Sequence, residues 1–293
     1  MNVFEFEKVH KSFPFGFWRK PRVVLNQISF SVHAGKVTGF VGSNGAGKTT
    51  SIKCLLGFIF PDSGQIRYFG NQKFSDTVKS KIGYLPERPY FYDFLTGTEF
   101  LRMHWQLSDQ KGGRKEFVER SERLLKKVDL LGAAHRPLRS YSKGMLQRIG
   151  IAQALLANPE VLILDEPMSG LDPEGRYTIK ELMREIALKD GATLFFSSHL
   201  LQDMEELCSE LVVVDHGELK YQGEILKLLQ DVSGESKIVF RNKTGVVESC
   251  FVAYVNLQKK IDELRSGNSE IIEVQKSRLK LEEAFQKIKT GQK

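Results

Sequence analysis

A short apolar strand followed by a glycine-rich loop is the feature that most restricts how this chain can fold. Val37–Val41 reads as a buried strand, and the loop after it has the sequence G-S-N-G-A-G-K-T. Glycines let the backbone N–H groups of such a loop point at phosphate oxygens, and a helix from Lys48 adds the positive end of its dipole. The pattern predicts that Lys48 reaches the β- and γ-phosphates of a nucleotide and that the Thr49 hydroxyl ligates Mg²⁺. The residues expected around the nucleotide are Gly42, Ser43, Asn44, Gly45, Ala46, Gly47, Lys48, Thr49 and Thr50.

Short apolar runs alternate with helical periodicity over most of the chain, which predicts an α/β sheet with mainly parallel central strands. Further strands are expected at 161–164, 193–196 and 211–214. Between about residues 88 and 158 the pattern is helical. Glu116–Val128 has apolar residues at helical spacing, and Ser142 can cap a helix that runs to Asn158 before Pro159. This region is predicted to be a helical insert in the α/β core.

The composition changes beyond about Gln222, where Ser233–Ser236 reads as a linker. A chain of 293 residues is long enough for one large domain and a small appendix. We therefore expect a core domain at 1–222 and a small α/β extension at 223–293. The three cysteines have no metal-ligand spacing and read as free thiols in a reducing compartment.

Two carboxylates follow the expected strand at 161–164. Asp165 and Glu166 would lie at the carboxyl end of a parallel strand, where ligands of such sheets bind. In this interpretation Asp165 holds Mg²⁺ and Glu166 accepts a proton from an attacking water. Taken alone, the segment also fits a strand that ends in polar residues before Pro167. The P-loop upstream favours the catalytic interpretation.

Further segments, in the same order, make the first 220 residues or so resemble the ATP-binding-cassette (ABC) family. Tyr141–Arg148, Y-S-K-G-M-L-Q-R, resembles the family's signature motif, which is usually written L-S-G-G-Q. Ser169–Asp172 is similar to the loop after the acidic pair, and His199 is similar to the switch histidine. The resemblance implies an ATPase with ATP and Mg²⁺ as cofactors. It also implies a P-loop NTPase core with an antiparallel β subdomain and the helical insert, plus the small C-terminal α/β extension.

The resemblance assigns roles to several of these residues. Ser142 and Gly144, at a helix N-terminus, would contact the γ-phosphate held by the P-loop of a second ABC ATPase subunit, in a homodimer or heterodimer. Taken alone, Ser142 fits a simple helix cap equally well. His199 would contact the phosphate or the attacking water, which makes Lys48, Glu166 and His199 the expected catalytic set. Asp172 would organise the shared interface or cap the helix that begins at Pro173.

The chain departs from the family pattern at three places. The signature has Tyr141, Lys143 and Met145 where the family has Leu, Gly and Gln, but Ser142 and Gly144 keep the phosphate contact possible. Glu87 stands where the family has a glutamine; it is a third expected Mg²⁺ ligand, although it adds a negative charge.

The third departure concerns the adenine platform. Phe13 stands where the family places an aromatic residue that stacks on adenine. The insert from Pro14 to Pro21 offers alternative platforms, namely Phe15, Phe17 and Trp18.

The chain has no stretch approaching the roughly 20 apolar residues needed to cross a bilayer. The resemblance therefore implies a cytoplasmic subunit, peripheral on the cytoplasmic face of the membrane, that energises a separate integral membrane permease. The Y-L-P-E and Y-S-K-G-M segments, with L-E-E-A-F near the C-terminus, resemble cassettes paired with export-type permeases.

The alternative is a soluble ABC ATPase that acts on nucleic acid or the ribosome, which the sequence pI of about 9.1 would suit. That class usually has two cassettes in one chain or a long coiled-coil insertion, and neither is visible here, so no nucleic-acid partner is expected. A binding module without turnover conflicts with the presence of Lys48, Asp165, Glu166 and His199.

Overall fold

The computed structural model describes residues 1–14, 21–108, 113–232, 235–253, 256–276, 281 and 285–286. They belong to two compact units, Met1–Gln222 and Gly223–Lys293. Among the described residues, no helix is both long enough and apolar enough to cross a membrane.

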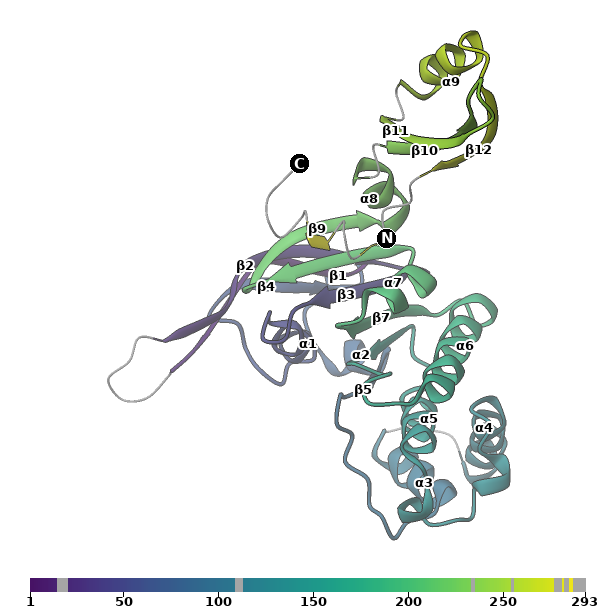
Figure 1. Cartoon of the computed structure of the whole chain (residues 1–293). Helices are drawn as coiled ribbons and strands as arrows, with labels where there is room; N and C mark the ends of the chain where they lie inside the picture. The colour runs from purple at the N-terminus through teal and green to yellow at the C-terminus, as the bar shows by residue number, and fades with distance from the viewer. Residues whose placement is uncertain are drawn as a thin grey trace. The chain divides into compact units, whose positions relative to one another are not determined.

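A six-stranded sheet forms the centre of the first unit, with the strand order β5-β6-β7-β3-β8-β9 (Figure 1). Its strands are β3 (Val37–Gly42), β5 (Ile82–Leu85), β6 (Val161–Leu164), β7 (Thr193–Ser198), β8 (Glu210–Asp215) and β9 (Glu218–Glu224). The pairs from β5 across to β8 are parallel. The carboxyl ends of β3, β6 and β7 therefore meet at one edge, which is where α/β sheets bind ligands. The predicted α/β fold is confirmed, and the predicted strands agree to within two residues.

Helices pack against this sheet, and the central strands are correspondingly apolar. Every residue of β6 and β7 is buried, as expected for parallel strands that are covered on both faces. The packing is close at Gly39 in β3, where a Cβ atom would lie 2.3 Å from the Met204 sulfur. The helices that pack on it include α1 (Lys48–Leu55), α6 (Pro173–Lys189) and α7 (Leu201–Leu207).

A second, antiparallel sheet in the same unit has the order β2-β1-β4. Its strands are β1 (Asn2–Phe13), β2 (Arg22–His33) and β4 (Ser63–Tyr68). A line of buried aromatic rings joins the two sheets: Phe6 stacks on Phe30 at 4.2 Å between ring centroids, and Phe40 lies 5.5 Å from Phe30 and 5.3 Å from Phe195. Each such ring contributes about 1.5–3 kcal/mol through burial. This core fixes β3, and with it the loop that follows β3.

The expected helical insert contains α3, α4 and α5, which lie together in Figure 1. The bounds in this part of the chain are α2 (Asp76–Lys79), α3 (Gly97–Leu107), α4 (Arg114–Lys127), η1 (Leu131–Ala133), η2 (Leu138–Ser140) and α5 (Lys143–Ala154). Thr96 and Glu99 form a capping box that starts α3. The amphipathic helix predicted at Glu116–Val128 is α4, with Phe117 and Leu124 buried.

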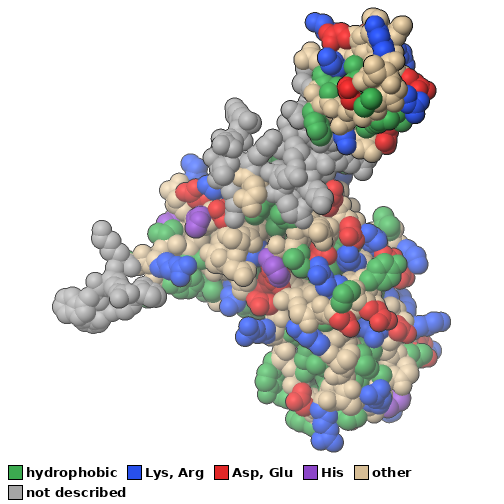
Figure 2. Space-filling view, viewed as in Figure 1, with side chains coloured by type: hydrophobic (Ala, Val, Ile, Leu, Met, Phe, Trp, Pro, Cys, Tyr) green, Lys and Arg blue, Asp and Glu red, His purple; other side chains and the backbone are tan. Residues whose placement is uncertain are grey.

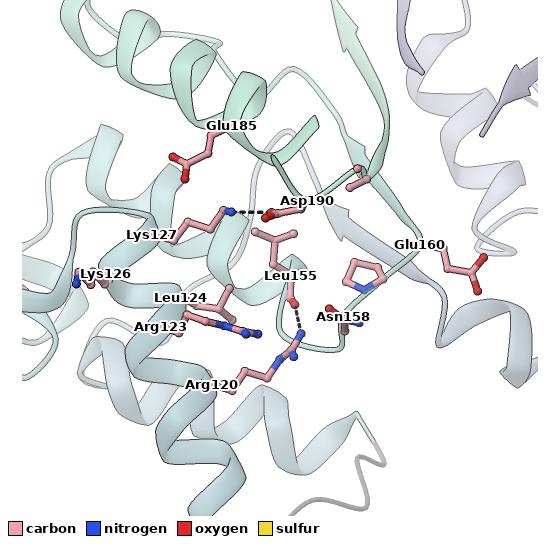
Figure 3. A pocket seen from close by; sticks show the side chains of 13 residues that line it. Arg120, Arg123, Leu124, Lys126, Lys127, Leu155, Asn158, Glu160, Glu185 and Asp190 are labelled. Atoms are coloured by element: carbon pink, nitrogen blue, oxygen red, sulfur yellow. Dashed lines mark hydrogen bonds and ion pairs between the residues drawn. The ribbon is translucent and has the colours of Figure 1, made fainter. Parts of the chain in front are cut away.

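The prediction that the helix after Ser142 continues to Asn158 is wrong, because α5 ends at Ala154. Arg120 on α4 donates to the carbonyl oxygens of Leu155, at 2.9 Å, and Leu156. These bonds satisfy carbonyls that a longer helix would use internally. Figure 3 shows Arg120 reaching Leu155 and the Lys127–Asp190 ion pair, with an N–O distance of 2.6 Å, beside a cavity of about 620 Å³.

The second unit contains a three-stranded antiparallel sheet of order β11-β10-β12. Its elements are α8 (Ile225–Val232), β10 (Glu235–Arg241), β11 (Val247–Ala253), α9 (Leu257–Ser266) and β12 (Glu270–Lys276). Ile238 and Phe240 in β10 are buried. The Asn242 side chain accepts hydrogen bonds from the backbone N–H groups of Thr244 and Val246, which shapes the turn between β10 and β11.

Candidate active site

The loop between β3 and α1 has a shape that only glycine permits at several positions. Gly45 and Gly47 have φ angles of +80° and +105°, a region that disfavours residues with a Cβ atom. A Cβ atom at Gly47 would also lie 2.7 Å from Leu25 Cδ2, and one at Gly42 would lie 2.4 Å from the Val214 carbonyl oxygen. Strands β2 and β8 therefore press the loop into the conformation that the sequence predicts for phosphate binding.

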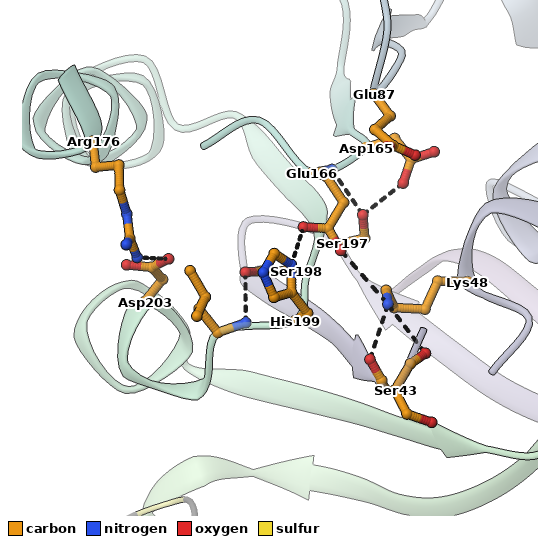
Figure 4. Close-up of polar contacts among 12 residues, drawn as sticks. Ser43, Lys48, Glu87, Asp165, Glu166, Arg176, Ser197, Ser198, His199 and Asp203 are labelled. Atoms are coloured by element: carbon orange, nitrogen blue, oxygen red, sulfur yellow. Dashed lines mark hydrogen bonds and ion pairs between the residues drawn. The ribbon is translucent and has the colours of Figure 1, made fainter. Parts of the chain in front are cut away.

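Lys48 is buried at the start of α1 and faces back over this loop (Figure 4). Its Nζ donates to the carbonyl oxygens of Gly42, at 2.9 Å, and Ser43, at 3.4 Å. The Ser43 hydroxyl in turn donates to Asp215 Oδ1, 2.7 Å away at the end of β8. The ammonium group is thus already positioned where it can meet the outer phosphates of a nucleotide.

A cleft of about 520 Å³ opens beside Lys48, a size within the usual range of small-molecule sites. It is lined by Arg22, Val24, Asn44, Gly45, Gly47, Lys48, Thr49, Thr50, Glu87, Glu166, Ser169 and His199. The fold therefore brings together residues that follow β3, β5, β6 and β7. Gly42, Ser43 and Ala46 belong to the same loop without lining this cleft.

Glu166 is held by three neighbours in the cleft (Figure 4). His199 Nδ1 lies 2.8 Å from its Oε2 atom, and Lys48 Nζ lies 3.5 Å from its Oε1 atom. Its backbone N–H donates to the Ser197 hydroxyl, at 2.8 Å. The backbone of Glu166 has a φ angle of +50°, which is uncommon for a residue other than glycine and often occurs at functional sites. A fixed, mostly buried carboxylate next to a phosphate-binding loop is arranged to accept a proton.

Asp165 lies behind Glu166 and is almost completely buried, with 1% of its surface exposed. Its Oδ1 atom accepts a hydrogen bond from Ser197 at 2.6 Å, whereas Oδ2 has no hydrogen-bond partner among the described residues. Burial raises the pKa of this carboxyl group, and the side chains of Ser197 and Thr49 counteract the rise in part. A buried oxygen without a donor fits a cation, because Mg²⁺ binds through one or two carboxylates, water and substrate phosphates. Thr49 and Glu87 supply further oxygen atoms in the adjoining cleft.

The stability of the nucleotide-free protein should depend on the charge of Asp165. Because the folded-state pKa is raised, the folded protein binds this proton more tightly than the unfolded chain does. The free energy of unfolding therefore falls as the pH rises through the range between the ordinary and the raised pKa. We expect Asp165→Asn to remove this component when melting temperature is measured against pH without divalent ions. An identical pH dependence in the variant and the wild type would contradict the assignment, and Glu174→Gln, at an exposed carboxylate, is the control.

Residues 25–169 match a family model described as ABC transporter. An uncharacterised ABC transporter ATP-binding protein of Synechocystis, sll0415, is 39% identical, and the alignment covers 97% of this chain and 84% of that protein. The chain belongs to the ABC transporter ATP-binding proteins. It binds and hydrolyses ATP.

Other proteins similar to this ABC ATPase are also ATP-binding proteins or cassettes. The bacitracin transport ATP-binding protein BcrA of Enterococcus faecalis is 39% identical over 70% of this chain and 66% of its own length. A solved ATP-binding subunit of an ABC transporter superposes with a TM-score of 0.66 at 29% identity, covering 78% of this chain and 92% of that one. The dimeric cassette MJ0796 with ADP and Pi has a TM-score of 0.67 at 21% identity, covering 76% and 98%, and shares the fold.

The segment after His199 is anchored to α6 of the ABC ATPase. Asp203 on α7 is buried and lies 2.8 Å from Arg176 Nη2 and 3.7 Å from Lys180 Nζ (Figure 4). The Leu200 N–H donates to the Ser198 hydroxyl at 3.0 Å. These contacts hold the backbone on both sides of His199 and so fix the position of its ring beside Glu166.

The signature residues lie in a separate cleft of about 420 Å³. Ser142 is the N-cap of α5 and accepts a hydrogen bond from the Met145 N–H at 3.2 Å. Asp172 is the N-cap of α6 and accepts from the Gly175 N–H at 2.9 Å. The capping interpretation therefore holds for both residues within one chain. This cleft also contains Gly144 and shares no lining residue with the cleft beside Lys48.

Phe13, the expected adenine platform, is not among the residues that line the cleft beside Lys48. Phe13 ends β1 opposite Arg22 and lies below Lys11 Nζ, 5.5 Å from the ring centroid, but it does not line the cleft. Phe15, Phe17 and Trp18 lie outside the described residues. Arg22 and Val24 face the cleft instead, and sequence reasoning did not identify them. The signal available was that β2 must begin directly after the insert and so run beside the P-loop. An adenine-stacking role for Phe13 stays a prediction.

Proposed function

We propose that this ABC ATPase is a transporter subunit that energises a separate integral membrane permease, with export as the direction of transport. The observation that carries the proposal is the separation of the two clefts. Lys48, Glu166 and His199 share one cleft, whereas Ser142 and Gly144 line another. A complete phosphate site that uses both sets therefore needs a second cassette.

Within one cleft the chemistry follows from fixed groups. The loop amides and Lys48 bind the β- and γ-phosphates and offset their charge. Thr49 and Asp165, with Glu87 beside them, would hold Mg²⁺, which neutralises further negative charge on the phosphate oxygens. Glu166 accepts a proton from the attacking water, and His199 keeps the carboxylate oriented through the 2.8 Å contact.

Across the dimer, α5 of one cassette would close over the nucleotide of the other. The Ser142 hydroxyl and the first N–H groups of α5 point at incoming anions, and the helix dipole adds to their attraction. Closure is driven by the difference in ATP affinity between open and closed pairs. Hydrolysis removes that difference, and the cassettes separate, which supplies a cyclic motion to the permease.

An exposed aromatic cluster after Glu87 supports docking to a permease. Tyr90 and Phe94 are 81% and 73% exposed, and Tyr92 lies between them with ring centroids 5.6 and 5.9 Å away. Exposed apolar clusters of this kind mark interaction sites. On the face shown in Figure 2, basic and acidic side chains are interspersed over the first unit, which favours a protein partner over nucleic acid.

Affinity purification from native membranes in mild detergent tests the proposal. We expect a multi-span membrane protein to co-purify in stoichiometric amount with the tagged chain. The variant Tyr90→Ser/Phe94→Ser should lose it, whereas Tyr177→Ser, at an exposed tyrosine of α6, should retain it. Recovery of ribosomal or nucleic-acid partners instead would overturn the transport proposal and leave the ATPase activity standing.

A further inference from the structure

One serine hydroxyl joins the two residues of the acidic pair (Figure 4). Ser197, on β7, is fully buried, with 0% of its surface exposed. Its hydroxyl donates to Asp165 Oδ1 at 2.6 Å, and its oxygen accepts from the Glu166 backbone N–H at 2.8 Å. A hydroxyl has one proton and two lone pairs, so both bonds form at once. Asp165 and Glu166 are therefore held by the same oxygen atom.

The bond to the Glu166 N–H stabilises an unfavourable backbone conformation. Glu166 has a φ angle of +50°, which is costly for a residue with a Cβ atom. Ser197 holds the N–H group of this residue, and the Ser169 N–H holds its carbonyl oxygen at 3.0 Å. With both polar groups of the backbone bound, the side chain of Glu166 leaves the loop in one fixed direction.

The end of β7 contacts Glu166 at two points. Ser197 binds its backbone, and His199, two residues farther along the chain, lies 2.8 Å from its carboxylate. Alternate residues of an extended chain face the same side, and Ser198 between them accepts from the Leu200 N–H instead. The place of the carboxylate relative to His199 and Asp165 therefore depends on the hydroxyl of Ser197.

We propose that Ser197 is a positioning residue for ATP hydrolysis. Its hydroxyl keeps the Glu166 carboxylate at a fixed place relative to Asp165, so that the carboxylate meets the attacking water. The inference rests on Glu166 as the proton acceptor in the proposed function. Loss of the hydroxyl leaves the Glu166 N–H and Asp165 Oδ1 without these partners in a buried place, where unpaired polar groups are costly. The backbone of Glu166 then relaxes and moves the carboxylate.

Ser197→Ala is expected to lower kcat by about 10- to 100-fold at saturating ATP and Mg²⁺, the loss that a displacement of a catalytic group by about 1 Å causes. Affinity for a fluorescent ATP analogue, measured without divalent ions, should change less than about twofold, because the change leaves the P-loop intact. Weaker nucleotide binding with an unchanged kcat would overturn the inference.

A matched pair of variants isolates the hydroxyl. Ser197→Thr keeps it, and Ser197→Val has the same shape without it, so both add the same methyl group to the core. We expect the threonine variant to turn over at least about tenfold faster than the valine variant. Equal rates in the two folded variants would count against the role of the hydroxyl. Thr38→Val removes a buried hydroxyl of β3 that has no hydrogen-bond partner among the described residues, and as the control it should leave kcat unchanged.

A double-mutant cycle with Glu166→Gln separates positioning from a general loss of structure. If Ser197 acts through the Glu166 carboxylate, Ser197→Ala should lower the residual kcat of Glu166→Gln by less than about twofold. An equal factor in both backgrounds would mean that Ser197 supports only the fold, and the inference alone would fail. Unchanged turnover in Glu166→Gln by itself would remove the proposed base, and the inference would fail with it.

Discussion

Glu166→Gln is expected to lower ATP turnover by about 100- to 10,000-fold, the range that a general base contributes. The amide keeps the size of the carboxylate and can still accept a hydrogen bond from His199, but it cannot take up the proton of the attacking water. Lys48 and the loop amides are untouched, so ATP should still bind. The variant should therefore accumulate as an ATP-bound dimer.

Phosphate release and size-exclusion chromatography with and without ATP and Mg²⁺ measure these two effects. Glu122→Gln, at an exposed carboxylate of α4, is the matched control and should behave like the wild type. Unchanged turnover in Glu166→Gln would remove Glu166 as the base. Lost turnover without a trapped dimer would leave the base assigned and count against closure by two cassettes.

Lys48→Ala is expected to weaken ATP binding by about 10- to 100-fold, which corresponds to the loss of a charged hydrogen bond to phosphate. The change also leaves the Gly42 carbonyl oxygen without its 2.9 Å donor and Glu166 without the cation that faces it. Both losses loosen the site before any nucleotide arrives.

Titration with a fluorescent ATP analogue measures this affinity. Lys53→Ala is the matched control, since Lys53 lies on the same helix and is exposed. Equal affinities of Lys48→Ala and the wild type would contradict a phosphate-binding role. Melting temperatures of the nucleotide-free variants establish that both fold.

Sequence patterns were sufficient for the parts of the site that depend on parallel-strand geometry. β3 ends in glycine, β7 ends in serine and β6 is followed directly by Asp165 and Glu166, and parallel strands place such ends at one edge. Lys48, Glu166 and His199 could therefore be expected together, although they are more than 30 residues apart in every pairing. The loop glycines could also be predicted from the sequence motif. The structure explains them, because their φ angles and close contacts exclude other residues.

Side-chain contacts between different helices and strands could not be predicted from the sequence. The sequence indicated that β2 begins directly after the insert, but the place of Arg22 and Val24, rather than Phe13, at the cleft depends on how β1 and β2 pair around the insert. The bridging role of Ser197, between Asp165 and the Glu166 backbone, depends on the β6–β7 register. The early end of α5 depends on Arg120, which comes from another helix.

The left-handed backbone at Glu166 means that the residue used for ATP hydrolysis lowers the stability of the fold. Holding a glutamate at a φ angle of +50° costs about 1–2 kcal/mol that glycine would avoid and asparagine would reduce. A laboratory selection for heat resistance alone would therefore drift toward glycine or asparagine at this position. The selected variants would be more stable and would still bind ATP, but they would no longer hydrolyse it. We therefore expect the glutamate to be kept only under selection for ATP turnover.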